Sequence, residues 1–446
     1  MRNIPLEEAL FEARERFAAR RPKSRQMHER ASAAMPGGNT RTVLWHGPFP
    51  LRAAGGSGAI LTDVDGHAYV NLLGEYTAGV FGHSHPAIRR AVEEALAGGV
   101  NLGAHGTAEV ELAERVVARF PAIESVRFTN SGTEANLMAV STARHVTGRP
   151  KVMVFDGAYH GALLSFGGGG IPINAPFPYV LARYNDTEGA VAAIAENAGE
   201  LACVLLEPMM GAGGCIPADP DFLVALREAS ADAGALLVLD EVMTSRFGRH
   251  GAGDLLGVRA DLVTLGKWVG GGLSFGAFGG RADVMAVYDP SAPGAVPHAG
   301  TFNNNALTMR AGIAALDEAF TPDIAEALHA RGEALRGRLV ALFADRGVAF
   351  TATGLGSLMT IHAAASTVRS PADLAGADAA ARELVFLDLL ERGFYMAHRG
   401  FIALSTQVTD AHLDGFLEAL DRILAERRTV LPHREAADAR VAPADG

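Results

Sequence analysis

The sequence predicts an α/β fold in which a large domain with a mostly parallel sheet is followed by a smaller α+β domain. Between residues 125 and 280, short apolar runs alternate with helical stretches, a pattern typical of a parallel sheet with helices on both faces. From residue 322 onward, helices flank short strands instead, which indicates the second domain. A chain of 446 residues is long enough for both domains.

The expected elements of the large domain are strands and helices that largely alternate along the chain. Its strands are predicted at residues 125–129, 151–155, 179–184, 202–207, 236–240 and 262–265. Its helices are predicted at residues 86–98, 108–119, 134–146, 187–197 and 220–233. Ligands of such sheets bind at the carboxyl ends of the strands, so the residues that follow each strand are the first candidates for a site.

The two ends of the chain are predicted to form the rest of the molecule. Residues 6–34 have an amphipathic helical pattern, and residues 58–73 predict a β-hairpin with its turn at Asp65-Gly66. The C-terminal elements are predicted as helices at 322–346, 371–392 and 410–427 and strands at 348–353, 357–362 and 401–405. We expect an N-terminal segment (residues 1–75) that contributes to the small domain and the active site, a large domain (76–321), and a small domain (322–446) whose tail is frayed.

Composition excludes several classes of protein. The net charge of −11 argues against a nucleic-acid-binding protein, which needs basic surface to neutralise phosphates. No apolar run approaches the length that crosses a membrane, and the N-terminus has no apolar signal core. The chain has two cysteines, which indicates no disulfide framework and fits a reducing compartment. We therefore expect a cytoplasmic enzyme with a small-molecule substrate.

Lys267 is the residue that singles out one stretch of the chain. Of the 39 basic residues, only Lys23, Lys151 and Lys267 are lysines. Lys267 follows a predicted strand and precedes three consecutive glycines at 270–272. A buried lysine loses its proton readily and its amine forms a Schiff base, whereas arginine does neither. The competing interpretation is an ordinary lysine that extends from a strand end into water.

The stretch Ser131-Gly132-Thr133 follows another predicted strand and begins a helix. Gly132 permits close approach of the backbone, the two hydroxyls are donors, and the first N–H groups of a helix are free to bind an anion. The stretch therefore predicts a phosphate cradle. An ordinary helix cap is the alternative.

Further chemistry-bearing residues lie at the ends of three more predicted strands. Tyr159 offers an aromatic face that could stack on a flat ring, although a surface tyrosine is the competing interpretation. Asp240 ends an apolar run, where a carboxylate needs a partner such as a protonated pyridine nitrogen; a cap or a metal ligand is the alternative. Glu207 closes a neighbouring strand and could reach the same site. His83 and His85 have no acidic cluster beside them, so we expect no metal.

Taken together, these strand ends predict a site for pyridoxal 5′-phosphate. The cradle would hold the phosphate, Tyr159 would stack on the ring, Asp240 would pair the pyridine nitrogen and Lys267 would bind the aldehyde. Each interpretation has an alternative when taken singly. Four such features at neighbouring strand ends make the shared explanation the stronger one.

The motifs that surround these residues resemble those of class III (ω-type) aminotransferases of fold type I, a family with a mostly parallel seven-stranded sheet. The resemblance covers nearly the whole chain. Its motifs are Asn-Ser-Gly-Thr-Glu-Ala-Asn at 130–136, Leu-Asp-Glu-Val at 239–242, Thr-Leu-Gly-Lys at 264–267 and Gly-Thr-Phe-Asn at 300–303. Within the class, the chain is most similar to bacterial aromatic β-amino acid (β-phenylalanine) aminotransferases, through Pro-Phe-Pro-Leu at 48–51, Glu-Tyr-Thr-Ala-Gly-Val at 75–80 and Asp-Glu-Val-Met-Thr-Ser-Arg at 240–246. Met-Pro-Gly-Gly at 35–38 more distantly resembles glutamate-1-semialdehyde aminomutase.

The resemblance implies roles for individual residues. Lys267 would be the Schiff-base lysine and would transfer protons, and Val242 would contact the ring opposite Tyr159. Thr301 would reach the phosphate of a neighbouring subunit, which implies a homodimer with shared active sites. Arg41 would bind the carboxylate of a β-amino acid, and Arg399 that of the acceptor.

The implied activity is ping-pong transamination from an aromatic β-amino acid to an oxo acid such as 2-oxoglutarate or pyruvate. Tyr76 could supply apolar surface for the aromatic ring or could be plain core packing. Two alternatives remain open: an aminomutase acting on glutamate 1-semialdehyde, and an ω-transaminase of other amines. A cofactor-binding protein without turnover is the alternative from another class, and the intact lysine, aspartate and cradle argue against it.

Overall fold

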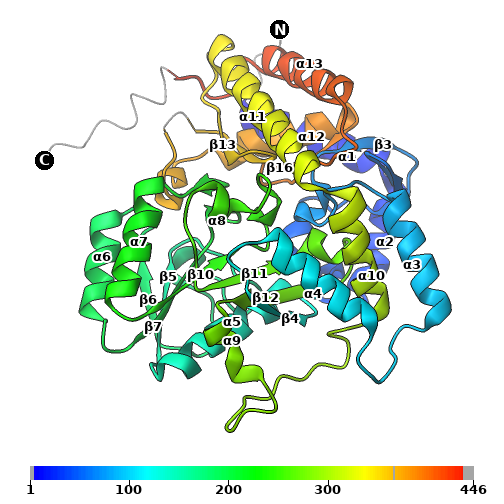
Figure 1. Ribbon diagram of the computed structural model, residues 1–446. Coiled ribbons are helices and arrows are strands. Elements are labelled where there is room, and N and C mark those ends of the chain that lie inside the picture. Colours follow the sequence, from blue (N-terminus) through cyan, green and yellow to red (C-terminus); the bar gives the residue numbers. More distant parts are fainter. Residues whose placement is uncertain (1–4, 365–366, 435–446) are drawn as a thin grey trace, which may run out of the picture.

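The computed structural model describes residues 5–364 and 367–434 and has a seven-stranded sheet at its centre (Figure 1). The strands, in spatial order, are β4 (Ser125–Thr129), β12 (Gly276–Gly280), β11 (Leu262–Gly266), β10 (Leu236–Asp240), β7 (Leu201–Leu206), β5 (Lys151–Phe155) and β6 (Tyr179–Ala182). Only β12 runs antiparallel to its neighbours. The prediction of a mostly parallel seven-stranded sheet is confirmed.

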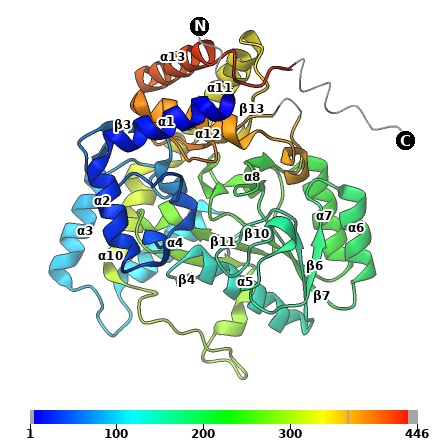
Figure 2. The ribbon, with the colours of Figure 1, turned by 180° about the vertical axis from the view of Figure 1, so that it is seen from behind.

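Helices cover this sheet because its strands are apolar on both faces. All of β7 and β10 is buried, as expected for strands inside a parallel sheet. α5 (Gly132–Thr147) packs on β11 and β12. α7 (Pro220–Asp232) packs on β7 and β10, and α6 (Thr187–Glu196) lies beside it on β6 (Figures 1 and 2). The remaining helices of this part are α3 (Pro86–Gly98), α4 (Thr107–Arg119), α8 (Ala252–Leu255), α9 (Ala282–Met285) and α10 (Ala306–Ala314).

β12 was absent from the predicted strands, and its glycines explain why. The sequence Gly-Ala-Phe-Gly-Gly resembles a loop, yet it pairs with both β11 and β4. A Cβ atom at Gly276 would lie 2.1 Å from the backbone oxygen of Ser131, and one at Gly280 would lie 2.0 Å from that of Asp261. The close approach of neighbouring backbone therefore selects glycine where β-propensity would select a branched residue.

The N- and C-terminal parts of the chain form the remaining layers together. A four-stranded sheet joins β1 (Ala53–Ser57), β2 (Ile60–Asp63) and β3 (Ala68–Asn71) to β15 (Phe394–Tyr395), and a three-stranded sheet contains β13 (Thr351–Leu355), β14 (Leu358–His362) and β16 (Phe401–Ala403). The predicted hairpin is confirmed as β2–β3. α11 (Pro322–Asp345), α12 (Ala379–Glu391) and α13 (Asp410–Glu426) lie at one end of the molecule with α1 (Leu6–Arg20) (Figures 1 and 2). A two-stranded ribbon pairs β8 (Met209–Met210) with β9 (Ile216–Pro217).

Two predicted helices are interrupted in the structure. The helix expected over residues 6–34 is split into α1 and α2 (Pro22–Ser32), because Pro22 has no N–H to continue the ladder and Arg21 has a non-helical φ of −127°. The helix expected over 371–392 begins as a short 3₁₀ turn, and α12 starts only after Asp378, whose side chain caps it. The predicted frayed tail lies mostly outside the described residues, and the proposed domain boundaries stay a prediction.

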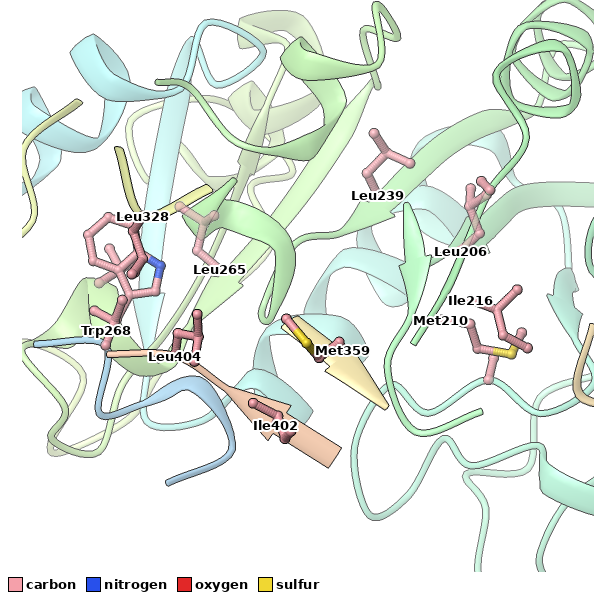
Figure 3. Close-up of a cluster of buried hydrophobic side chains, with 14 of the residues drawn as sticks. Leu206, Met210, Ile216, Leu239, Leu265, Trp268, Leu328, Met359, Ile402 and Leu404 are labelled. Carbon is pink, nitrogen blue, oxygen red and sulfur yellow. The ribbon is translucent and has the colours of Figure 1, made fainter. Parts of the chain in front are cut away.

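The larger of two clusters of buried apolar residues in the described chain runs through both parts of the molecule. Figure 3 shows Leu206, Leu239 and Leu265 from the central sheet in the same cluster as Met359 and Ile402 from β14 and β16. Such continuity fixes the C-terminal strands against the carboxyl edge of the central sheet. Among the described residues, no helix is both long and apolar enough to cross a membrane.

The N-terminal segment is attached through a buried arginine, Arg21, which has 1% of its surface exposed. Its Nη1 donates to Glu391 Oε1 at 2.6 Å and its Nε donates to the Tyr69 hydroxyl at 3.1 Å. The carboxylate of Asp63 lies 3.7 Å away and is fully buried. Arg21 thus neutralises two carboxylates contributed by distant parts of the chain.

We expect Arg21→Ala to lower the free energy of unfolding by about 3–5 kcal/mol, because it leaves buried carboxylates without a counter-charge. Urea-induced unfolding followed by circular dichroism measures this change. Arg89→Ala is the control, since Arg89 pairs with Glu93 on an exposed helix face and its removal should leave the midpoint nearly unchanged. Equal midpoints for both variants would contradict the assignment.

Candidate active site

A cavity of about 300 Å³ lies at the carboxyl edge of the central sheet. Eight of the nine residues predicted to hold the cofactor line it: Ser131, Gly132, Thr133, Tyr159, Glu207, Asp240, Val242 and Lys267. They come from the ends of β4, β5, β7, β10 and β11. The parallel arrangement therefore collects residues that are up to 136 positions apart into one site.

The cradle at one end of the cavity is built on the first turn of α5. Ser131 is the N-cap, with its hydroxyl accepting a hydrogen bond from the Glu134 N–H at 3.1 Å. A Cβ atom at Gly132 would lie 2.8 Å from Val242, so only glycine fits between the helix start and that side chain. The cap and the cradle, alternatives from the sequence, are therefore compatible. The free N–H groups of this first turn lie at the positive end of the helix dipole and are therefore available to bind an anion.

Asp240 is held by donors from several elements. The Asn136 side-chain amide donates to Oδ2 at 2.8 Å, and His160 Nδ1 donates to the same oxygen, also at 2.8 Å. The Val242 N–H donates to Oδ1 at 3.0 Å. The carboxylate is 4% exposed, so these contacts fix its direction in a site that excludes most water. A carboxylate oriented in this way suits a protonated ring nitrogen.

Lys267 begins the 3₁₀ turn Lys267–Gly270 directly after β11 and has a φ of 55°. A left-handed conformation is strained for a residue with a side chain, and such strain is common at functional positions. Burial lowers the pKa of the Lys267 ammonium, Asp240 and Glu207 oppose the shift, and Arg399 and Arg41 add to it; the net pKa is about 8. The site therefore provides an amine that is partly unprotonated near neutral pH.

Glu207 and Tyr159 lie on the same side of the cavity. The Tyr159 N–H donates to Glu207 Oε2 at 3.1 Å, and the Gly211 N–H donates to Oε1 at 2.9 Å. Burial raises the pKa of Glu207 to about 7. The Tyr159 side chain is 46% exposed, so its ring retains a free face for stacking.

The three predicted substrate residues form a second cluster beside the cavity. Tyr76 is 8% exposed and contacts two cations: its ring centroid is 5.8 Å from Arg41 Cζ and 5.3 Å from Arg399 Cζ. The ring also stacks on Phe401, with centroids 5.4 Å apart. Both arginines lower the pKa of Lys267, so their charges act electrostatically on its amine. This arrangement can hold carboxylate groups close to Lys267.

Thr301 is the predicted cofactor residue that does not line this cavity. It is exposed, and its segment lies beside the cradle, where the Asn130 side-chain amide donates to Asn303 Oδ1 at 2.9 Å. A role at the site of a neighbouring subunit remains a prediction.

Sequence reasoning assigned no role to Asn136 and His160, which orient Asp240. Both are 1% exposed. The available signal was a polar residue on the face of α5 that otherwise packs on the sheet, together with a histidine directly after the stacking tyrosine. Among residues 5–364 and 367–434, no cluster of three or more His, Cys, Asp or Glu side chains could hold a metal ion.

The residues of the cavity fit pyridoxal 5′-phosphate. Gly132 keeps the cradle open where any Cβ would fill it, and a φ of 114° at Gly161 brings the loop after Tyr159 against Thr133. In the same cavity, the buried carboxylate of Asp240 and the amine of Lys267 match the ring nitrogen and the aldehyde in chemistry.

Comparison with known proteins agrees with this fit. The family model for class III aminotransferases matches residues 44–424. The β-phenylalanine transaminase of Variovorax paradoxus is 52% identical over 432 residues, covering 97% of this chain and 99% of the relative. A crystal structure of a β-phenylalanine aminotransferase from that organism superposes with a TM-score of 0.95, at 52% identity, covering 96% of this chain and 99% of the other. A glutamate-1-semialdehyde 2,1-aminomutase of Sorangium cellulosum is 38% identical, covering 93% of this chain and 97% of the relative. The chain therefore belongs to the class III aminotransferases, a family of enzymes that depend on pyridoxal 5′-phosphate.

Proposed function

We propose that this aminotransferase moves the amino group of an aromatic β-amino acid, of the 3-amino-3-phenylpropanoate type, to an oxo acid such as 2-oxoglutarate or pyruvate in a ping-pong reaction. The observation that carries the proposal is the pair of guanidinium groups on Tyr76, beside the amine of Lys267. Both substrates are carboxylates, and an arginine fork binds a carboxylate through two hydrogen bonds. The similarity to a β-phenylalanine transaminase supports the aromatic donor.

The cofactor supplies an aldehyde that takes up the amino group and a ring that withdraws electrons from the reacting carbon. Ser131, Gly132 and Thr133 would hold its phosphate, Tyr159 and Val242 would enclose its ring, and Glu207 would lie near its hydroxyl. Asp240 would keep the ring nitrogen protonated. The fixed direction of its carboxylate, set by Asn136 and His160, suits that role.

Lys267 would act as the proton carrier. Its Nζ would remove the proton from the amine-bearing carbon of the donor and later return a proton to the corresponding carbon of the acceptor. A pKa of about 8 suits both tasks, because the group exchanges protons near neutral pH. The amine-bearing carbon of the donor must lie close to Lys267 Nζ for this transfer. Binding of the donor's carboxylate at Arg41 would hold the carbon there.

Each of the two arginines would recognise the carboxylate of a different substrate. Arg41 is exposed in the stretch before the 3₁₀ turn Thr42–Leu44, where it could meet the donor as it enters. Arg399 is half-buried, and its Nη1 donates to the Ala212 backbone oxygen at 3.3 Å. Arg41 would bind the carboxylate of the β-amino acid and Arg399 that of the acceptor. We further propose a homodimer in which Thr301 completes the phosphate site of the partner.

An aminomutase is the competing function, since relatives at 38% identity carry that name. A mutase isomerises one molecule and needs no acceptor, so the requirement for an oxo acid separates the two. The test compares 3-amino-3-phenylpropanoate, β-alanine, 1-phenylethylamine and glutamate 1-semialdehyde, each with and without 2-oxoglutarate or pyruvate. Turnover of glutamate 1-semialdehyde alone, without an added oxo acid, would overturn the proposal.

Replacing Lys267 with alanine should abolish transamination and remove the visible absorbance of the lysine-linked cofactor, because Lys23 and Lys151 lie outside the cavity. Steady-state assays and an absorption spectrum measure both effects. Retained turnover would remove Lys267 from its catalytic role.

The rate at which the cofactor-free enzyme binds pyridoxal 5′-phosphate should rise with pH through a midpoint near 8. The unprotonated amine is the reactive form, and its pKa is lowered from 10.5 to about 8 by burial. Stopped-flow absorbance across this range measures the midpoint. A rate that continues to rise toward 10.5 would show that the amine is not desolvated.

Arg41→Ala should lower kcat/KM for 3-amino-3-phenylpropanoate on the order of 100-fold, the loss expected for a charge-assisted contact. The same ratio measured with 1-phenylethylamine, which has no carboxylate, should change less than about threefold. Arg89→Ala, an exposed arginine in a helix-surface ion pair, is the matched control. An equal loss for both donors would place Arg41 outside the recognition site.

A further inference from the structure

The segment that carries Tyr76 has an unusual backbone. Gly74, Glu75, Tyr76 and Thr77 have consecutive φ values of 52°, 49°, 53° and 79°. Three of these residues are not glycine, and a left-handed conformation is strained for each of them. A run of this kind persists only when surrounding contacts impose it, so the contacts that hold this turn determine where the Tyr76 ring lies.

Asn71, at the end of β3, provides the contacts that hold the turn. Its Oδ1 accepts hydrogen bonds from the N–H groups of Leu73 at 3.0 Å and Gly74 at 3.2 Å. Its Nδ2 donates to Glu75 Oε1 at 2.6 Å and to His83 Nε2 at 3.0 Å. The side chain is 4% exposed. A primary amide has two donors and two acceptor positions, and Asn71 uses all of them.

The turn has little freedom to move on its other sides. A Cβ atom at Gly74 would lie 2.6 Å from the Ala403 backbone oxygen, so the turn packs directly on β16. The carboxylate of Glu75 folds back over Gly79, where a Cβ would lie 1.7 Å from Oε2. The hydrogen bond from Asn71 therefore sets the direction of the Glu75 side chain, and through it the left-handed path that leads into Tyr76.

Tyr76 transmits this geometry to the two arginines. Its hydroxyl donates to the Val43 backbone oxygen at 3.1 Å, two residues from Arg41, and its ring stacks on Phe401, two residues from Arg399. Both guanidiniums lie within 6 Å of the ring. Each guanidinium is attracted to the electron-rich ring, so the ring helps to hold both cations in place. A shift of the ring would move both cations.

We propose that Asn71 is a positioning residue for carboxylate recognition: its amide fixes the left-handed turn 74–77 and so places Tyr76, Arg41 and Arg399 for substrate carboxylates. This inference rests on the proposed function of the two arginines. It adds a residue that touches neither substrate nor cofactor. The aspartate isostere cannot replace Asn71, because it loses both donors and brings a second carboxylate within 2.6 Å of Glu75.

Three variants of the holoenzyme test the inference. Asn71→Ala removes every contact of the amide, whereas Asn71→Asp keeps the acceptor for the N–H groups of Leu73 and Gly74 and loses the donors. The double variant Asn71→Asp with Glu75→Gln restores one hydrogen bond in the reverse direction. Asn197→Ala is the matched control, because that asparagine also links two segments, donating to Ala193 at 2.8 Å and accepting from Lys151 at 3.0 Å, at the opposite edge of the sheet.

The expected signature is a change in KM that depends on the carboxylate. For Asn71→Ala and Asn71→Asp, KM for 3-amino-3-phenylpropanoate should rise on the order of tenfold while kcat changes less than about threefold. With the carboxylate-free donor 1-phenylethylamine, kcat/KM should also change less than about threefold. The double variant should recover most of the lost discrimination. Asn197→Ala should match the wild type on both donors. Thermal melting and cofactor content, measured on every variant, report general damage.

Two results would overturn the inference. An equal loss on both donors, in parallel with lowered melting temperature, would show that Asn71 only stabilises the fold. An unchanged KM in Asn71→Asp would show that the donors to Glu75 and His83 are not needed. The wild-type and Arg41→Ala enzymes distinguish this result from a failure of the proposed function. If neither enzyme prefers carboxylated donors, the proposed function is wrong, and the inference that rests on it is wrong as well.

Discussion

The hydrogen bonds to the buried carboxylate of Asp240 are the interaction on which the site depends. They connect the end of β10 to α5 through Asn136 and to the loop after β5 through His160. The Thr264 hydroxyl of β11 donates to Asn136 Oδ1 at 2.7 Å, which brings a further strand into the network. A parallel sheet places strand ends at a common edge, but it does not by itself fix the loops that follow them. This network provides that fixation, and the cradle and Lys267 take their relative positions from it.

Opposite charges surround the Lys267 amine. Asp240 and Glu207 are buried carboxylates that line the cavity, whereas the guanidinium groups of Arg41 and Arg399 lie within 6 Å of the Tyr76 ring outside it. The carboxylates raise the pKa of the Lys267 amine and the arginines lower it, so these effects partly cancel. Burial is therefore the main cause of the lowered pKa. A bound carboxylate would neutralise the arginines and weaken their lowering of that pKa. Under the proposed function, binding of the substrate carboxylate would thereby make the Lys267 amine more basic.

The sequence predicted the alternating elements well because the buried strands are uninterrupted apolar runs, as in Leu201–Leu206. It failed where packing overrides local preference: β12 is glycine-rich because backbone crowds it, and Pro22 divides what looked like one helix. Most of the proposed cofactor residues could be grouped from the sequence because they lie at or just after strand ends, whereas Val242 and Thr301 entered through resemblance. Arg41 and Arg399 entered only through resemblance, since nothing local separates them from the other arginines. Their meeting on Tyr76 is a contact between positions far apart in the chain, which no local pattern encodes.

Because the chain has only three lysines, cofactor occupancy could be measured by lysine-specific cleavage. A lysine-specific protease would have three sites, after Lys23, Lys151 and Lys267, and none of them precedes proline. If Lys267 binds the cofactor aldehyde as proposed, reduction of that bond would block one of these cuts, so that residues 152–446 would remain a single fragment. The ratio of that fragment to residues 152–267 and 268–446 would then count occupied sites by mass, without any assay of turnover. Replacing surface arginines by lysine for formulation or coupling would sacrifice this property.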